Sequence, residues 1–259
     1  MEMISLKSPR EIEHMRRAGR ITAAARALAG KLVKPGVTTL EIDHAVRKFI
    51  EEQGATPSFL GYAGYPGSAC ISVNDEVIHG IPGHRRLKEG DIVSVDVGAL
   101  FEGFHGDCAA TFPCGEVSPE ALRLIQVTRQ SFFEGIQFAR AGKRVSDISR
   151  GVQQYAEANG CSLVRDYVGH GVGRKLHEAP EVPNFCTEGH RASPRLQPGM
   201  TLAVEPMVNL GTWEVRVLED GWTVKTADGA LSAHFENSIL ITDGEPEILT
   251  VCEEASPWI

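Results

Sequence analysis

Apolar residues recur at helical spacing in two segments of the chain that lie 106 residues apart. In residues 35–54 and in residues 141–160 the apolar positions follow the spacing i, i+4 and i+7, which gives a helix one apolar stripe. The matching positions are Ile42, Val46 and Phe49 in the first segment and Ile148, Val152 and Tyr155 in the second. Thr38 and Glu41 form the capping-box pattern that begins a helix. The spacing therefore predicts two equivalent helices, each lying on a sheet.

A second pattern, typical of strands, repeats at nearly the same distance. Residues 87–96 and 196–205 each contain a turn that ends in glycine and then a β-rich run with a carboxylate at its far end. Two further helices are predicted to begin at Ser8-Pro9 and Ser118-Pro119, with proline at the first helical position.

These matches occur in the same order and predict an internal duplication. We expect two αβ halves, at about residues 1–115 and 116–259, that pack as one domain over residues 1–259. A coincidence of short patterns is the alternative interpretation.

Composition narrows the class of protein. The chain has 42% hydrophobic and 23% charged residues, as ordinary globular proteins do, and a net charge of −8 argues against general nucleic-acid binding. We find no secretory signal pattern and no run of about 18 uncharged apolar residues, so no membrane span is expected. The six cysteines form no C-x-x-C pair, which favours reduced thiols in a cytoplasmic protein.

Four carboxylates interrupt otherwise apolar or uncharged stretches: Asp96, Asp107, Glu205 and Glu236. A buried carboxylate costs several kcal/mol unless it is paired, protonated or bound to a metal. For any one of them a buried ion pair is the alternative. However, Asp96 and Glu205 occupy equivalent positions of the repeat, and clustered carboxylates cannot all ionise without cations. No basic residue lies in the strands that carry them, so the set predicts a metal site.

Several histidines accompany these acids. His170 is flanked by glycines, which leave its ring unobstructed, and His79 and His177 lie in similar short motifs. A lone histidine is more often structural than functional. We therefore assign no role to the other histidines, including His105 and His234, although both lie close to the acidic positions.

The residues in this order resemble the five-ligand set of the "pita-bread" metallopeptidases, and the local strings are similar to type I methionine aminopeptidases along essentially the whole chain. The strings are Cys70-Ile71-Ser72-Val73-Asn74, His79-Gly80-Ile81-Pro82, Phe104-His105-Gly106-Asp107, Gly169-His170-Gly171-Val172-Gly173 and Glu205-Pro206-Met207-Val208. The resemblance implies an α+β pita-bread fold, with two pseudo-symmetric αβ halves around a mostly antiparallel sheet.

The resemblance also implies the roles of single residues. Asp96, Asp107 and Glu236 serve a pair of divalent metal ions, two of them as bridges, and His170 and Glu205 bind one ion. His79 and His177 contact the substrate. The methionine pocket is implied at Phe59, Tyr62, Tyr65, Cys70, Leu176 and Trp222. Position 176 departs from the pattern, because relatives commonly have Phe there and Leu widens the pocket.

The implied function is removal of the N-terminal methionine from nascent proteins and peptides by a water activated between two metals, with a small second residue preferred. Four carboxylates and one imidazole suit Co, Mn, Fe or Zn. Glu205 is expected to act as general base, His177 to stabilise the oxyanion and His79 to hold the next amide. An X-Pro peptidase of the same fold and a metal-free binding module remain the alternatives. We further expect a monomer. For Lys31 and Lys34 a solvated loop is the favoured interpretation, and a transient ribosome contact is the alternative.

Overall fold

The computed structural model describes residues 3–186 and 193–252 of the chain. Its long helices are α1 (Pro9–Leu32), α2 (Thr39–Glu52), α3 (Pro119–Ile136) and α4 (Val145–Ala158). The expected helix starts are confirmed, since Ser8, Thr38 and Ser118 each accept a hydrogen bond from a backbone N–H of the first helical turn. The capping box of Thr38 and Glu41 is also present.

The N-terminal half forms a sheet around one long hairpin. Its strands are β1 (Thr56–Pro57), β2 (Ala69–Val73), β4 (Ile92–Phe101) and β5 (Phe104–Pro113), with β5 on one edge of β4 and β1 and β2 on the other. Asp96 lies in the middle of β4, which continues five residues beyond it to Phe101, so the expectation of a carboxylate at the strand end is wrong here. The extension pairs with β5 over the full length of the hairpin.

The C-terminal half forms a sheet of shorter strands in the order β15-β14-β9-β7-β8. The strands are β7 (Gly169–Gly171), β8 (Glu178–Val182), β9 (Thr201–Val204), β14 (Asn237–Leu240) and β15 (Glu247–Ile248). Two small sheets complete the architecture. One joins β6 (Ser162–Leu163), β10 (Met207–Asn209) and β13 (Ser232–His234), and the other joins β3 (Glu76–Ile78), β11 (Val215–Val217) and β12 (Val224–Thr226). All strand pairs among the described residues are antiparallel.

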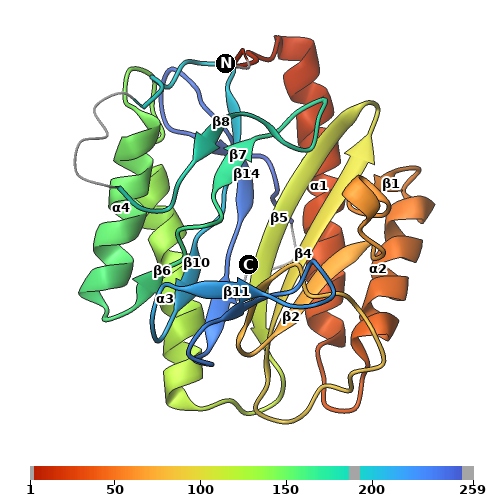
Figure 1. Ribbon diagram of the computed structural model, residues 1–259. Helices are drawn as coiled ribbons and strands as arrows, with labels where there is room; N and C mark the ends of the chain where they lie inside the picture. Colours follow the sequence, from red (N-terminus) through yellow and green to blue (C-terminus); the bar gives the residue numbers. More distant parts are fainter. Residues whose placement is uncertain (1–2, 187–192, 253–259) are drawn as a thin grey trace.

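The two halves join at the centre of the molecule, where β5 runs beside the segment that leads into β14 (Figure 1). Ala109 and Glu236 exchange both backbone hydrogen bonds, with N···O distances of 3.3 and 2.9 Å. A two-fold axis through this pair maps residue 109 onto residue 236. It therefore also maps Asp96, which lies opposite Ala109 on β4, onto Glu205, which follows β9.

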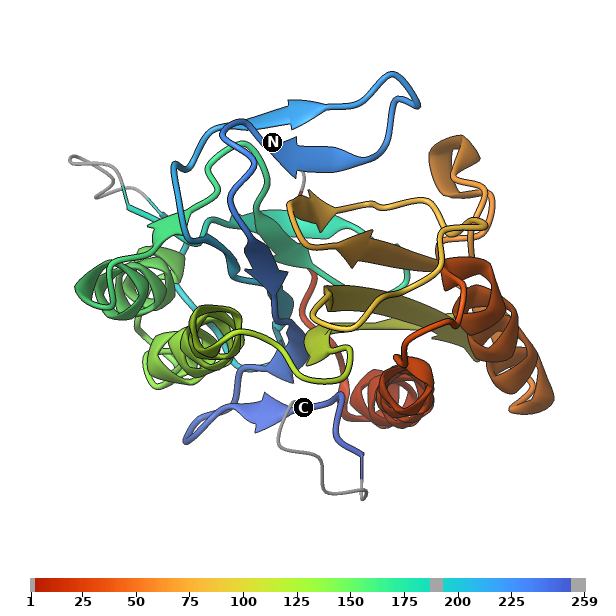
Figure 2. The ribbon, with the colours of Figure 1, turned by 90° about the horizontal axis from the view of Figure 1, so that it is seen from below.

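The helices cover one side of the sheets, and the β11–β12 hairpin lies on the opposite side (Figure 2). Side chains of a strand alternate between its two faces. On β4 the residues Val93, Val95 and Val97 join the main core beneath the helices, so Ser94 and Asp96 face the other way. The functional side chains therefore lie on the face that the helices leave uncovered. No helix of the described ranges is both long and apolar enough to span a bilayer.

Candidate metal centre

The strand register places three of the acidic side chains together. Asp96 on β4 lies opposite Ala109 on β5, and Ala109 lies opposite Glu236. Asp107 precedes Ala109 by two residues and shares its face. The register thus places the three carboxylates around the small side chain of Ala109.

The C-terminal half contributes the next two groups from β7 and β9. Glu205 directly follows β9, and His170 on β7 lies opposite Ala203, two residues before Glu205. The His170 Nε2 atom is 3.5 Å from Glu205 Oε1 and 3.8 Å from Asp107 Oδ2. The structure therefore brings all five expected ligands to one place, although more than 100 residues separate the first from the last along the chain.

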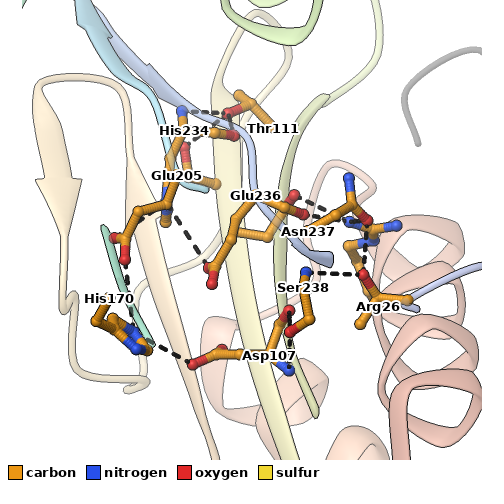
Figure 3. A network of polar contacts seen from close by, with 12 residues as sticks. Arg26, Asp107, Thr111, His170, Glu205, His234, Glu236, Asn237 and Ser238 are labelled. Carbon is orange, nitrogen blue, oxygen red and sulfur yellow. Dashed lines mark hydrogen bonds and ion pairs between the residues drawn. The ribbon is translucent and has the colours of Figure 1, made fainter. Parts of the chain in front are cut away.

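His234, to which sequence reasoning assigned no role, also points into this cluster (Figure 3). Its Nε2 atom lies 3.9 Å from Glu205 Oε2 and 4.0 Å from Glu236 Oε2. The sequence contains one clue to this placement. His234 lies two residues before Glu236, and residues two positions apart share a face of an extended segment. His105 takes a different path, with its Nδ1 atom hydrogen bonded to Ser58 Oγ at 2.8 Å.

Burial and mutual repulsion dominate the electrostatics of the cluster. Burial raises the pKa of Asp96 to about 7. The pKa values of Asp107, Glu205 and Glu236 are raised well above the usual range, first by burial and then by repulsion from the neighbouring carboxylates. Burial likewise lowers the pKa of His170 and of His234 to about 3, so both rings are neutral at physiological pH and offer lone pairs.

Atoms without partners show that the cluster fits divalent cations. Asp96 Oδ1, Asp107 Oδ1, Glu236 Oε1 and His234 Nε2 are buried, and each lacks a hydrogen-bond partner. Arg26 of α1 lies nearby but donates to the carbonyl oxygens of Ala109 and Glu236 and to Asn237 Oδ1 (Figure 3). Unpaired buried oxygens are costly unless a cation binds them. Carboxylates with imidazole form a donor set typical of divalent transition metals.

The ligand atoms fall into two groups that share one carboxylate. Within the described ranges, Asp107, His170 and Glu236 offer one ligand atom each within 4.8 Å of one another, and so do Glu205, His234 and Glu236. Glu236, which belongs to both groups, is placed to serve two ions.

A buried apolar group adjoins the cluster. Phe59, Tyr65, Cys70 and Leu176 form one buried group, and Trp222 packs against it. Cys70 on β2 lies opposite Asp96, so the apolar group adjoins that carboxylate. Tyr62 is not in this group: its side chain is 43% exposed, and its Oη atom is hydrogen bonded to His177 Nδ1 at 2.7 Å.

His177 lies beside the metal-ligand cluster, and His79 lies beside the apolar group. The ring of His177 lies 4.2 Å from that of His170, between centroids, and His79 packs edge-on against Tyr167 and Trp222. His177 has a solvent-exposed surface. Protein atoms nevertheless surround its ring closely enough that desolvation lowers its pKa. Burial, and then repulsion by His177, lowers the pKa of His79 to about 4. Both rings are thus neutral near pH 7.

Comparison with known proteins identifies the family. The family model of metallopeptidase family M24 matches residues 13–243. The methionine aminopeptidase of Clostridium perfringens is 55% identical over 249 residues, which make up 96% of this chain and 99% of that protein. The chain belongs to the methionine aminopeptidases of family M24.

Solved structures agree with this membership. The crystal structure of methionine aminopeptidase from Thermotoga maritima has a TM-score of 0.93 at 46% identity, covering 96% of this chain and 99% of that chain. The prolidase from Pyrococcus furiosus, at 21% identity and a TM-score of 0.77, covers 96% of this chain and 66% of that chain and shares the fold alone. The expected pita-bread fold is therefore confirmed, and an M24 metallopeptidase uses divalent metal ions.

Proposed function

We propose that this chain removes the N-terminal methionine from nascent proteins and peptides, with a preference for a small second residue. The observation that carries this proposal is the contact between a buried apolar group and a carboxylate cluster, through the pair Cys70 and Asp96. A methionine side chain is apolar and unbranched, so it suits a site lined by this group. The α-amino group would then lie toward the carboxylates, which explains the selection for a chain terminus.

We assign the metal ligands to Asp96, Asp107, His170, Glu205 and Glu236. Two divalent ions held there would supply Lewis acidity and lower the pKa of the attacking water. The oxygen-rich donor set suits Mn, Fe, Co or Zn. The unpartnered atoms Asp96 Oδ1, Asp107 Oδ1 and Glu236 Oε1 support this assignment, because ion binding would satisfy all three.

The chain's own groups then move the protons. Glu205 acts as general base: its carboxylate takes a proton from the attacking water and delivers it to the departing amine. His177 donates a hydrogen bond to the oxyanion that develops on the methionine carbonyl. His79 holds the amide of the second residue.

Tyr62 prepares His177 for this role. A phenol that donates to Nδ1 of a neutral imidazole leaves the ring proton on Nε2, where it can be donated to the substrate. The distance of 2.7 Å between Tyr62 Oη and His177 Nδ1 is that of a hydrogen bond, and the proposed role of His177 requires the phenol to donate it. The sequence placed Tyr62 in the methionine pocket, whereas we propose that it positions His177.

We also propose that residues 1–259 act as one catalytic domain with halves at about 1–115 and 116–259. The activity would take place in the cytoplasm, which fits the six free cysteines. A monomeric state and a ribosome contact through Lys31 and Lys34 remain predictions.

A direct test compares two peptide classes. The purified protein is incubated with Met-Ala-Ser and with X-Pro peptides, with a chelator and then with each divalent metal in turn, and products are followed by mass spectrometry. We expect release of methionine that the chelator abolishes and added metal restores. Faster cleavage of the X-Pro peptides would overturn the proposed substrate, and full activity without metal would overturn the metal centre.

A further inference from the structure

The axis that relates the two halves gives His234 a counterpart. Because residue 109 maps onto residue 236, Asp107 maps onto His234, since each precedes its axis residue by two positions. Likewise Thr111 maps onto Ser238. His234 therefore occupies the position in the C-terminal half that an expected metal ligand occupies in the N-terminal half.

Hydrogen bonds around the two residues support this equivalence. The Ser238 hydroxyl accepts from the backbone N–H of Asp107 at 3.1 Å and donates to its carbonyl oxygen at 2.9 Å. The Thr111 hydroxyl accepts from the backbone N–H of His234 at 2.9 Å and donates to its carbonyl oxygen at 2.9 Å. Each backbone is thus held by a hydroxyl group of the opposite half, in the same geometry. The side chains of Asp107 and His234 project from the sheet in corresponding ways.

The burial and surroundings of the His234 side chain are also those expected of a metal ligand. Its ring is 2% exposed, and its Nε2 atom has no hydrogen-bond partner. This atom faces Glu205 Oε2 at 3.9 Å and Glu236 Oε2 at 4.0 Å. Ions such as zinc bind nitrogen and oxygen ligands at about 2.1 Å, so donor atoms up to about 4.2 Å apart can share one ion.

We propose that His234 Nε2 is a sixth ligand of the metal centre, on the ion that Glu205 and Glu236 hold. This inference rests on the proposed two-metal centre and extends its ligand set. Glu205, His234 and Glu236 each offer one ligand atom within 4.8 Å of one another, and His170, which is expected on the same ion as Glu205, supplies the first imidazole of that ion. A second nitrogen donor shifts the preference of that subsite toward Fe, Co and Zn and away from Mn, because imidazole suits the former metals.

Metal titration of the purified, metal-free protein tests this assignment without an activity assay. The variant His234→Gln keeps a polar group that can hydrogen bond the carboxylates but lacks the imidazole. Isothermal titration with Co²⁺ and with Mn²⁺ should show that His234→Gln weakens Co²⁺ binding at one of two sites by more than about 10-fold, since even groups beyond the ligands contribute that much. Binding of Mn²⁺ should weaken less. The visible absorption spectrum of the Co²⁺-loaded protein should change in the variant.

A matched control is His105→Gln. His105 is likewise two residues from an expected ligand, but its Nδ1 atom is occupied by Ser58. This control should titrate like the unaltered chain, and circular dichroism should show that both variants are folded. If His234→Ala is used instead, added imidazole should restore the Co²⁺ spectrum.

Two results would overturn the inference. Equal weakening for Co²⁺ and Mn²⁺ with an unchanged Co²⁺ spectrum would show that His234 only hydrogen bonds the carboxylates. Unchanged affinities for both ions would show that it has no part in the centre. Failure of the unaltered chain to bind two ions would instead refute the proposed function itself, so the two failures are distinguishable.

Discussion

The N-terminal half builds its part of the site on two regular ten-residue strands, whereas the C-terminal half uses strands of three or four residues. Both halves nevertheless offer side chains at the same places. Asp96 corresponds to Glu205, and Asp107 corresponds to His234. Regular strands are therefore not required for the geometry, because the cross-strand contacts at the axis hold the backbone of both halves in register.

The halves differ at positions where one half carries a ligand side chain and the other half does not. Ala109 at the axis corresponds to Glu236, and Ser72, which lies opposite Ser94 on β4, corresponds to His170, which lies opposite Ala203 on β9. The imidazoles of the cluster thus come from the C-terminal half. A carboxylate in place of Ala109 would put two further oxygens against Glu236 and add repulsion. A duplicated backbone therefore provides equivalent positions in the two halves, and single substitutions decide which of those positions bind cations.

The largest expected effect comes from giving the two residues at the two-fold axis, 109 and 236, the same side chain. The substitution Glu236→Ala gives both axis positions the same small side chain and removes the carboxylate that the two ligand groups share. We expect kcat/KM on Met-Ala-Ser to fall by more than about 1,000-fold, because metal ions contribute several kcal/mol to such reactions. Steady-state kinetics and metal analysis check this. The control Glu181→Ala removes an exposed carboxylate of the same sheet and should retain both ions. Retained activity in Glu236→Ala would contradict the shared-carboxylate arrangement.

The metal-free protein should lose stability as the pH rises. The folded state holds the Asp96 proton up to about pH 7, whereas the unfolded chain releases it near the ordinary value of 3.8. Between these values the folded state binds more protons, so the free energy of unfolding falls as the pH increases. The loss should be on the order of 3 kcal/mol between pH 4 and pH 8.

Calorimetry of chelated protein across this range measures that loss, with Asp96→Asn as the control variant. The amide cannot ionise, so Asp96→Asn should show a smaller loss than the unaltered chain. Saturation with Co²⁺ should reduce the loss as well. Parallel curves for the unaltered chain and Asp96→Asn would contradict the proposed burial of a protonated Asp96.

The two hydroxyl groups at the axis should have similar effects on stability. Thr111→Val and Ser238→Ala each remove a hydroxyl that satisfies a buried backbone N–H and carbonyl of the opposite half. Each substitution should lower the free energy of unfolding by about 1–3 kcal/mol, the usual effect of leaving buried polar groups unsatisfied. Urea denaturation provides the measurement. An effect confined to one of the two would break the proposed symmetry of the halves.

The smallest expected effect concerns the hydrogen bond between Tyr62 of the N-terminal half and His177 of the C-terminal half. Tyr62→Phe removes the hydroxyl that bonds His177 Nδ1. Loss of about 0.5–1.5 kcal/mol should lower kcat about 2- to 10-fold with little change in KM or metal content. Nitrogen NMR should show His177 leaving a single tautomer. Tyr155→Phe, on helix α4, is the matched control, and in a His177→Ala background Tyr62→Phe should have no further effect.

Much of the fold was predictable from local sequence. Capping pairs such as Thr38 with Glu41 act within one turn, so the helix starts were predicted correctly. The repeat predicted the equivalence of Asp96 and Glu205, because side-chain alternation and turn glycines are also local properties. The resemblance of short motifs identified the family, which the comparisons confirmed.

Tertiary structure alone decided where the two halves touch. The register that sets Ala109 against Glu236 joins residues 127 positions apart, and no local preference encodes it. That register places His234 beside Glu205 and leaves its Nε2 atom without a partner. The path of the chain around Tyr62 likewise sets its hydroxyl against His177 Nδ1. Local sequence determines which face of a strand a side chain takes. Packing between distant segments decides which side chains meet, because bringing distant segments together costs chain entropy that only the contacts of the folded state offset.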